Sequence, residues 1–383
     1  MAKGKRVAIC AVAQVKNDGD YWYLRFQNML LECFESIMEQ TKVTFDMEKG
    51  IRNVITCSDD IFDARTISDN GMTDVVGAQF RGEEKMAQES INGLGYAMAC
   101  ILSGHDDVIL YMGHAKETQP ESRQMCTNLA FDPFYTRPLG MDFQNANALQ
   151  ARTYMEKAGI TEEHLAKIVV RSRMNAKKNP FARENEMVDE KAVMNSPMLA
   201  DPIRALHYYP VTDWAFGMLL CCEERAKEFT KNPVWLTGYG SCMDSYYLGD
   251  KDLASNFSLK NAAQRAYSMA GVKDPRKEIG LFELDDHAAY QLPMWAEGIG
   301  LADEGKGGAW IDAGGPDKSN VNLSGGHLNG NPLLLGGAAR AIDCVLQLRG
   351  EAGERQVKGV KRALAHGTYG AAGQHQAVVI MEA

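Results

Sequence analysis

Hydrophobic positions in the first part of the chain follow two periods, one typical of strands and the other of helices. "RVAICAVAQV" and "DDVILYMG" are continuous apolar runs, which predict buried strands. "YLRFQNMLLECFESIMEQ" spaces its apolar residues as a helix does, and "SINGLGYAMACILSG" predicts a helix of unusually small residues. Strands that alternate with helices in this way predict an α/β sheet with helices packed on its faces.

The last part of the chain repeats this order of elements. Its expected elements, strands and helices in alternation, are "PVWLTGYGS", "SLKNAAQRAYSMAG", "IGLFELDD", "LLLGGAARAIDCVLQLRG", "KRALAHGTYG" and "HQAVVIME". In both parts a helix rich in Gly and Ala leads into an apolar strand, which suits two helices that pack closely at the centre of a molecule. We therefore predict two similar halves, residues 1–230 and 231–383.

The region between the two parts differs in composition and in its hydrophobic pattern. Residues 115–209 are polar, Met-rich and helical in patches, as in "NANALQARTYMEKAG" and "TEEHLAKIVVRSRMNAKKNP". The apolar strand pattern resumes at "TDWAFGMLLCCEERAKEF". We interpret this region as an insertion into the first half that covers one face of its sheet.

Composition narrows the class of protein. The chain has 383 residues, 45% of them hydrophobic and 24% charged, which is typical of a globular protein of two or three packed units. No apolar run approaches the length of about 20 residues that a membrane span needs. A net charge of −9 makes nucleic acid an improbable partner. The nine cysteines form no regular pairs and no CxxC motif, which indicates a reducing, cytoplasmic location and no metal ribbon.

Several stretches together resemble one known family, over nearly the whole chain and in the right order. They are "SGHDDVILYMGHAKE", "NSPMLADPIRALHYYPVTDWAFGMLLCCEERA", "GLFELDDHAAYQLPMWAEGIGL", "SGGHLNGNPLLLGGAARAIDCVLQLRGEAGERQV" and "ALAHGTYGAAG". The chain resembles the thiolase superfamily, in particular the sterol-carrier-protein-type thiolases. The resemblance implies the thiolase fold: two duplicated βαβαβαββ halves in five layers (α/β/α/β/α), with a loop domain inserted in the first half. It also implies a dimer.

The resemblance draws attention to a missing nucleophile. Thiolases place a reactive Cys at the start of the central helix of the first half, where the helix N-terminus favours a thiolate. The corresponding place falls in "MAQESING", which has no Cys and offers only Glu89 and Ser90. We expect Cys57 and Cys100 to be structural thiols. A carboxylate at a helix N-terminus tends to have a lowered pKa, which weakens Glu89 as a base unless burial counteracts it.

Further candidates come from the family's other motifs. In "HAAY", His287 and Tyr290 match a His and an aromatic residue of the family. Asn331 stands where the family has a catalytic His. Its amide can donate a hydrogen bond to a thioester oxygen but cannot titrate. The alternative is that Asn331 only satisfies backbone groups of its loop. His366 matches a histidine of the sterol-carrier type. Tyr369 replaces a small residue, and either fills space or acts as an acid.

The family's substrates carry coenzyme A, and two features of the chain are candidates to bind it. Gly325 and Gly326 lack Cβ atoms, so that a pantetheine arm can approach closely; Gly370 is a third such position. A basic cluster in the inserted region is the candidate for the phosphates, with a solvated helix face as the alternative. The members of this cluster are Arg171, Arg173, Lys177 and Lys178.

From the resemblance we expect an enzyme that acts on acyl-CoA thioesters and makes or cleaves a carbon–carbon bond beside the thioester. The reaction is either a thiolase-type acyl transfer or a retro-aldol cleavage without a nucleophile. The alternative is a catalytically silent thiolase-like subunit that scaffolds an active partner. Members of this branch often pair with a small subunit that carries an OB-fold and a zinc ribbon. We expect a homodimer, no metal, and no tightly bound cofactor, since coenzyme A is part of the substrate.

Overall fold

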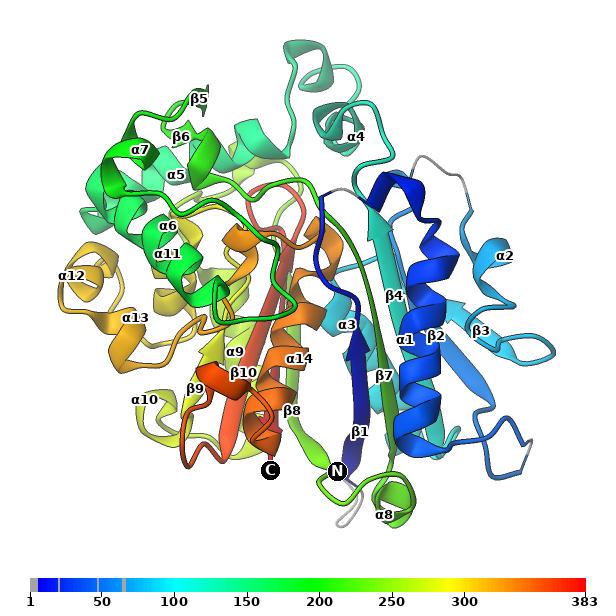
Figure 1. The fold of residues 1–383 in the computed structure, drawn as a ribbon. Coiled ribbons are helices and arrows are strands. Elements are labelled where there is room, and N and C mark those ends of the chain that lie inside the picture. Colours follow the sequence, from blue (N-terminus) through cyan, green and yellow to red (C-terminus); the bar gives the residue numbers. More distant parts are fainter. Residues whose placement is uncertain (1–5, 20, 47, 64–66) are drawn as a thin grey trace.

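A computed structural model describes residues 6–19, 21–46, 48–63 and 67–383. One mixed nine-stranded sheet runs through these residues (Figure 1). Its strands, in spatial order, are β3 (Gly82–Lys85), β2 (Asn53–Cys57), β4 (Val108–Lys116), β7 (Asp213–Cys222), β1 (Val7–Gln14), β8 (Val234–Met243), β11 (His375–Glu382), β10 (Arg362–Tyr369) and β9 (Leu281–Glu283). The mixed α/β fold class predicted from the sequence is confirmed.

The first half follows the order β1, α1 (Phe26–Thr41), β2, α2 (Asp69–Met72), β3, α3 (Ser90–Ser103), β4 and β7. Helix α1 forms where the apolar residues recur at helical spacing, and that face is buried against β1, β4 and β7. β4 lies inside the sheet between β2 and β7, so the edge of this half is β3.

The second half keeps the order β8, α9 (Phe257–Ala270), β9, α14 (Gly336–Arg349), β10 and β11. The strand that would precede α14 is reduced to a single parallel bridge between Phe282 and Val321. The shorter helices of this half are α8 (Ala226–Phe229), which leads into it, and α10 (Pro275–Glu278), α11 (Gln291–Gly298), α12 (Gly307–Asp312) and α13 (Gly315–Lys318).

The two halves join where β1 pairs with β8 and enclose two central helices. α3 contacts strands of both halves, α14 contacts α3, and both helices are largely buried (Figure 1). Small residues make this packing possible. A Cβ atom on Gly93 would lie 2.4 Å from the Tyr111 hydroxyl, and one on Gly95 would lie 2.3 Å from the Tyr239 ring.

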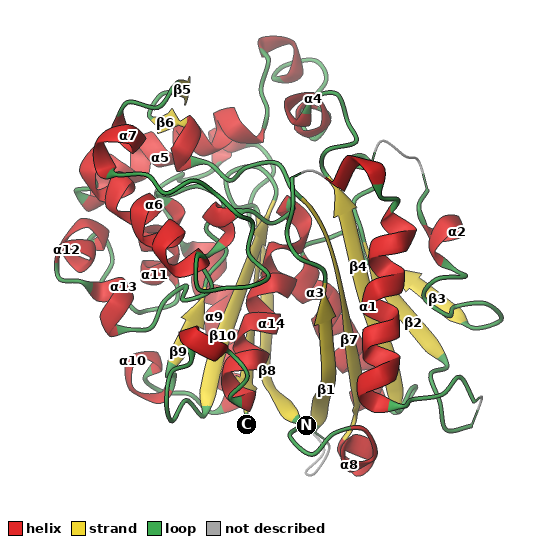
Figure 2. Cartoon of the chain, viewed as in Figure 1, coloured by secondary structure: helices red, strands yellow, loops and turns green. Residues whose placement is uncertain are grey.

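The segment between β4 and β7 forms mostly helical structure beside the sheet (Figure 2). It holds α4 (Arg123–Asn128), α5 (Phe143–Ala158), α6 (Glu162–Ala176), α7 (Glu190–Met194), β5 (Met198–Ala200) and β6 (Ile203–Arg204). α5 and α6 pack on α11 and α12 of the second half through a shared apolar core. Within the described residues, no helix is long and apolar enough to cross a membrane.

The packing of α3 predicts the effect of one added methyl group. Gly93→Ala should lower the free energy of unfolding by about 1–3 kcal/mol, the usual cost of overpacking a core. Ser103→Ala, at the exposed end of the same helix, is the control and should change it by less than about 0.5 kcal/mol. Urea unfolding followed by circular dichroism measures both. A neutral Gly93→Ala would contradict the tight contact with Tyr111.

Candidate active site

The N-termini of the two central helices meet at one carboxyl group. Glu89 is the N-cap of α3, and its Oε2 accepts a hydrogen bond of 2.7 Å from the Ile91 amide. Its Oε1 accepts a hydrogen bond of 3.1 Å from the amide of Gly337 in the first turn of α14. Ser90 Oγ accepts a hydrogen bond of 2.8 Å from the Ala338 amide. The motif "ESI" thus ties α3 to α14 through side-chain oxygens.

Burial dominates the electrostatics of Glu89. The side chain is 0% exposed, and a Cβ on Gly337 or Gly367 would lie 2.1 Å from its carboxyl atoms. Burial and the nearby Asp285 charge raise the pKa of Glu89 to about 8, although the amides of Ile91 and Gly337 favour the charged form. The helix N-termini therefore do not lower this pKa below its ordinary value, and the carboxyl group changes charge near neutral pH.

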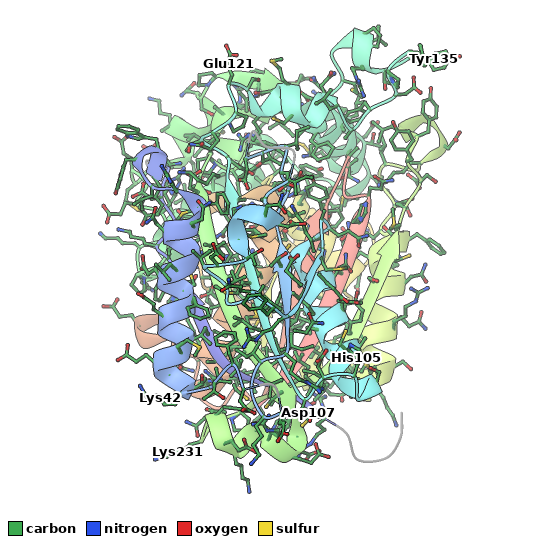
Figure 3. All side chains as sticks on the ribbon, turned by 90° about the vertical axis from the view of Figure 1, so that its right-hand side faces the viewer. Lys42, His105, Asp107, Glu121, Tyr135 and Lys231 are labelled. Carbon is green, nitrogen blue, oxygen red and sulfur yellow. The ribbon has the colours of Figure 1, made fainter. Side chains whose placement is uncertain are left out.

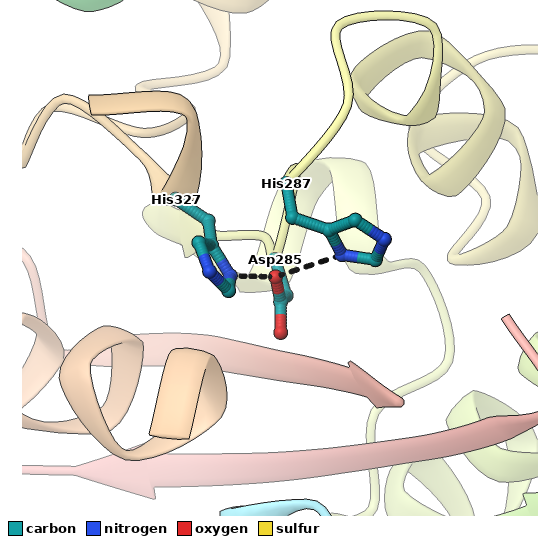
Figure 4. Close-up of side chains that lie close together, drawn as sticks. All are labelled: Asp285, His287 and His327. Atoms are coloured by element: carbon teal, nitrogen blue, oxygen red, sulfur yellow. Dashed lines mark hydrogen bonds and ion pairs between the residues drawn. The ribbon is translucent and has the colours of Figure 1, made fainter. Parts of the chain in front are cut away.

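A second buried cluster joins Asp285 to two histidines (Figure 4). His327 Nδ1 contacts Asp285 Oδ1, and its Nε2 donates to the Asn331 carbonyl at 2.7 Å. His287 Nδ1 lies 3.7 Å from the same Asp285 oxygen. The other Asp285 oxygen accepts a hydrogen bond from the Thr368 amide at 3.2 Å. The histidines hold the pKa of Asp285 below its ordinary value against the effect of burial, so that this carboxylate stays charged.

The amides around His287 fix its tautomer. Nε2 receives hydrogen bonds from Asn147 Nδ2 at 3.2 Å and from Gln291 Nε2 at 3.0 Å. The orientation of Gln291 is set by the Ala288 amide, which donates to its Oε1. Nε2 is therefore an acceptor, and Nδ1 carries the hydrogen toward Asp285. Burial lowers the pKa of His287, which favours this neutral form.

The atoms of Asp285, His287 and His327 lie close enough to hold a cation, within 4.8 Å of one another. A metal on His287 Nδ1 would, however, require a hydrogen on Nε2. That hydrogen would point at the two amide donors of Asn147 and Gln291. The donor arrangement thus fits a hydrogen-bonded acid–base cluster better than a metal site.

The sequence did not identify Asp285, His327 or Glu117, which lies next to them, as candidates. Glu117 is buried, and its Oε1 accepts hydrogen bonds from the Leu333 amide at 2.7 Å and the Tyr209 hydroxyl at 3.2 Å. The Tyr209 ring lies 4.9 Å from the His327 ring. Burial raises the pKa of Glu117 despite the nearby Arg123 charge. The signal available in the sequence was the pair of carboxylates in "LDDHAAY" and the His in "SGGHLNG".

Asn331 brings an unpartnered donor to the site. Its Oδ1 accepts a hydrogen bond from Arg340 at 3.1 Å, which directs Nδ2 away from that guanidinium. Nδ2 is buried and has no hydrogen-bond partner among the described residues. Asn331 lines a small crevice together with Asn329 and Arg340. An unpaired buried donor costs about 1–3 kcal/mol, so an acceptor atom of a ligand is favoured there.

His366 holds other groups in place. Its Nε2 donates to Gln376 Oε1 at 2.6 Å, and its Nδ1 accepts a longer hydrogen bond from the Asp285 amide. Burial lowers the pKa of His366 to about 4, so the ring is neutral at pH 7. His366 therefore helps to hold the backbone of Asp285 in place.

The two tyrosines lie at different distances from the cluster. Tyr290 is buried, and its hydroxyl donates to Gln150 Oε1 at 2.7 Å on the α5 side of His287. Tyr369 donates to Asp59, which follows β2, and its ring contacts Phe143 at 5.8 Å. Tyr369 is therefore beside the cluster rather than within it, packed on Phe143 and hydrogen-bonded to Asp59.

Only two of the four basic residues of the predicted cluster line a common groove. Arg173 and Lys177 line a groove of about 450 Å³, and Lys16 and Arg183 add their charges from outside α6. Burial and the charge of Arg183 lower the pKa of Arg173 to about 10. Arg171 instead donates to Asp317 at 2.6 Å and to the Val321 carbonyl at 2.7 Å. Lys178 is exposed and lies outside the lining of the groove.

The double glycine packs tightly between the inserted segment and the second half. Gly325 has a φ of 102°, and a Cβ there would lie 2.6 Å from the Ala176 Cβ. Gly326 has a φ of 69° and lines the same crevice as Asn331. Both glycines are required by backbone conformation and close contact, and Gly326 is the one that faces the crevice.

Among the described residues, no cysteine takes part in the hydrogen bonds that join α3 to α14, although Cys57 lies beside them. Cys57 ends β2, and its thiol contacts the Gln88 carbonyl at 3.6 Å. Burial raises the pKa of Cys57 above its ordinary value, so the thiol stays protonated and is a poor nucleophile. Cys100 lies in the interior of α3, with its pKa also raised by burial.

Comparisons with known proteins find related sequences over most of the chain. Residues 240–383 match the family model described as thiolase C-terminal domain-like. An acetyl-CoA acetyltransferase of Methanothermobacter thermautotrophicus is 30% identical over 380 residues, which cover 96% of this chain and 98% of that protein. The benzoylsuccinyl-CoA thiolase subunit BbsB of Thauera aromatica is 28% identical over 58% of this chain and 59% of its own length.

Two solved structures share the fold. The Ltp2-ChsH2(DUF35) aldolase aligns with a TM-score of 0.82 at 17% identity and covers 99% of this chain and 98% of its own. A monomeric SCP2-thiolase-like protein of Mycobacterium smegmatis aligns with a TM-score of 0.76 at 16% identity, over 98% of this chain and 77% of its own.

The raised pKa of Glu89 predicts how stability depends on pH. The native state holds this proton up to pH about 8, whereas the unfolded chain releases it near about 4.3. Stability should therefore fall as pH rises through this window, because the native state binds more protons. In Glu89→Gln the fall should be smaller, while exposed Glu354→Gln should follow the wild type. Urea unfolding at about pH 5 and about pH 8.5 measures the change in the free energy of unfolding between the two pH values. An equal change in all three proteins would refute the raised pKa.

Proposed function

The chain belongs to the thiolase superfamily, and on that premise we propose that it cleaves or forms a carbon–carbon bond in an acyl-CoA thioester without an acyl-cysteine. The observation that supports this most is the Glu89 carboxyl at the junction of α3 and α14, because the cap and first turn of α3 hold no Cys. Acyl transfer needs an enzyme nucleophile to carry the acyl group, and at neutral pH a thiolate serves best. A retro-aldol step needs only a base and a stabilised enolate.

In the proposed reaction a base takes the proton of a β-hydroxyl group. The Cα–Cβ bond then breaks, its electron pair forms the thioester enolate, and the β-carbon leaves as a carbonyl. Glu89 is the proposed base, because a pKa of about 8 suits proton transfer near neutral pH. The buried Nδ2 of Asn331 is the proposed donor to the enolate oxygen. The proton that Glu89 accepted then returns to Cα, so that no net proton is lost, while Asp285 stays charged beside His327.

The remaining candidates have supporting roles in this proposal. His287 and Tyr290 shape the side of the site that faces α5 through their hydrogen bonds to Asn147 and Gln150. His366 positions Asp285. Tyr369 is proposed to border the substrate, with its hydroxyl held by Asp59.

The basic groove is proposed to hold the phosphates of coenzyme A. Arg173 and Lys177 line it together with Lys16, which is paired with Glu184, and Asn329 lines both it and the crevice of Asn331. Clustered positive charge within a groove attracts a polyanion in spite of the net negative charge of the protein. The thioester would then enter past Gly326.

A silent subunit that serves an active partner is the second candidate. Both Glu89 oxygens are occupied by helix amides, and the cluster around it is fully buried, which is the observation that favours this reading. Since related proteins are named as a thiolase subunit and as a complex with a DUF35 chain, we propose a heteromeric assembly with a small OB-fold partner. The edge strand β3 is the proposed site of homodimer pairing.

A carboxylate base predicts a pH-dependent rate without an acyl-enzyme. With a β-hydroxyacyl-CoA substrate, kcat/KM should rise with pH to a midpoint near about 8, because only ionised Glu89 accepts a proton. Glu89→Gln should lower it by about 10²–10⁴-fold, and Glu354→Gln should not change it. Intact-protein mass spectrometry should detect no acyl adduct. Acyl transfer to Cys57 or Cys100 would instead restore ordinary thiolysis.

The groove predicts which arginine binds the coenzyme. Arg173→Gln should raise the Kd of acetyl-CoA by about 10–100-fold, the value of one charge-assisted hydrogen bond. Arg152→Gln, on the exposed face of α5 in the same inserted segment, is the matched control and should leave the Kd within about twofold. Isothermal titration calorimetry measures both. Equal effects of the two variants would place the coenzyme elsewhere.

A further inference from the structure

Glu117 is a buried carboxyl group that the proposed reaction does not use. It follows β4 directly and is 3% exposed. Its Oε1 accepts a hydrogen bond of 2.7 Å from the amide of Leu333, which begins the short helix η7 (Leu333–Leu335) just after Asn331 and Pro332. We propose that Glu117 is a positioning residue that holds Asn331 where its side chain can donate to the enolate oxygen. The inference rests on the proposed function and adds a residue of the first half to it.

The backbone around Asn331 needs an anchor from outside its loop. Gly330, just before Asn331, has a φ of 121°, a conformation that glycine adopts and leaves more freely than other residues. Pro332, just after it, has no N–H group to donate. The amide of Leu333 is therefore the first backbone donor beyond Asn331, and it donates to Glu117. The loop is fixed at the first point where its chain allows this.

Two partners hold Asn331 from its own half of the molecule. Its carbonyl accepts a hydrogen bond from His327 Nε2 at 2.7 Å, and its Oδ1 accepts one from Arg340 at 3.1 Å. Both partners belong to the second half, as Asn331 does. The proposed base, Glu89, belongs to the first half. The distance between the base and the enolate donor is therefore set by contacts that cross between the halves.

Two carboxyl groups of the first half make such contacts. Glu117 holds the Leu333 amide, and Glu89 holds the Gly337 amide at 3.1 Å, so the two bonds flank the start of α14. α3, which Glu89 caps, leads along the chain into β4, which Glu117 follows, and the two elements pack on each other. The base and the carboxyl group that anchors the Asn331 loop thus belong to one packed unit.

Tyr209 and Arg123 keep the Glu117 side chain in place. The Tyr209 hydroxyl donates to Glu117 Oε1 at 3.2 Å, and its ring lies 4.9 Å from the His327 ring. Arg123 Nη1 lies 3.5 Å from Glu117 Oε2, and its guanidinium lies 4.2 Å from the Tyr209 ring centroid. Both carboxyl oxygens have partners, which directs Oε1 at Leu333. The hydrogen bond from Leu333 requires an acceptor oxygen rather than a charge, and a glutamine side chain offers the same oxygen.

Hydrogen exchange of the full-length protein, measured by mass spectrometry, tests this placement without turnover. Glu117→Leu removes the acceptor, whereas Glu117→Gln removes the charge and keeps an acceptor oxygen. In Glu117→Leu the amides of residues 327–335 should exchange about tenfold faster, the usual effect of one lost buried hydrogen bond, and those of α9 should not change. In Glu117→Gln both regions should stay within about twofold of the wild type. Arg123 loses its ion pair in both variants, so it cannot cause the difference.

Three results of the exchange measurement would overturn the inference. If Glu117→Gln accelerates residues 327–335 as much as Glu117→Leu does, the charge and not the acceptor holds the loop. If α9 accelerates in the same proportion, Glu117 only stabilises the whole fold. If neither variant changes the exchange, Glu117 holds nothing in place.

Cleavage of 3-hydroxybutyryl-CoA to acetaldehyde and acetyl-CoA tests the role in catalysis. Glu117→Leu should lower kcat by about 10–100-fold, because the donor is misplaced, and leave the Kd of acetyl-CoA within about twofold. Glu117→Leu/Asn331→Ala should be within about threefold of Asn331→Ala alone, since both changes disable the same donor. Losses that multiply would mean that Glu117 acts elsewhere, and the inference would be wrong.

Glu121→Leu is the matched control for these rates. Glu121 is an exposed glutamate on the same segment after β4, and Figure 3 shows it at the end of the molecule opposite to Lys42 and Lys231. This variant should match the wild type in kcat and in hydrogen exchange; a loss equal to that of Glu117→Leu would refute a specific role of Glu117. If the wild type does not cleave the probe, the proposed function fails, and the exchange measurement alone decides the placement.

Discussion

One carboxyl group at the meeting point of two helices constrains the centre of this protein. Glu89 satisfies amides at the N-termini of both α3 and α14, and this is possible only because glycines at 337 and 367 leave room for it. The helix amides favour the charged form and burial favours the neutral one. Burial prevails, and the pKa rises to about 8. The position that usually activates a thiol here holds a group suited to proton transfer.

Much of the fold could be predicted from the sequence because it depends on local periodicity. The continuous apolar run of β4 and the helical spacing of α1 correspond to the observed elements. The loss of one strand to the bridge of Phe282 with Val321 could not be foreseen, since a glycine-rich stretch carries no strand pattern to count. The edge position of β3 was also hidden, because its polar residues give no apolar signal.

The site was predictable only where a motif carried it. Counting along the chain placed Glu89 at a helix start, and its capping role agrees with this. Asp285 and His327 stand 42 residues apart in sequence and touch only in the folded protein, so their pairing needed the structure. Whether the helix N-terminus or burial sets the Glu89 pKa was left open by the sequence, because sequence indicates helix ends but not the depth at which they are buried; burial prevails.

Glu89 is a buried carboxyl group whose raised pKa makes it titrate near neutral pH. Infrared difference spectroscopy of the protonated carboxyl stretch measures this directly, with Glu89→Gln to assign the band. The wild type should show a band that disappears with a midpoint at about pH 8, and the variant should lack this band. A band with a midpoint near the ordinary value of glutamic acid, or one unchanged by the substitution, would contradict it.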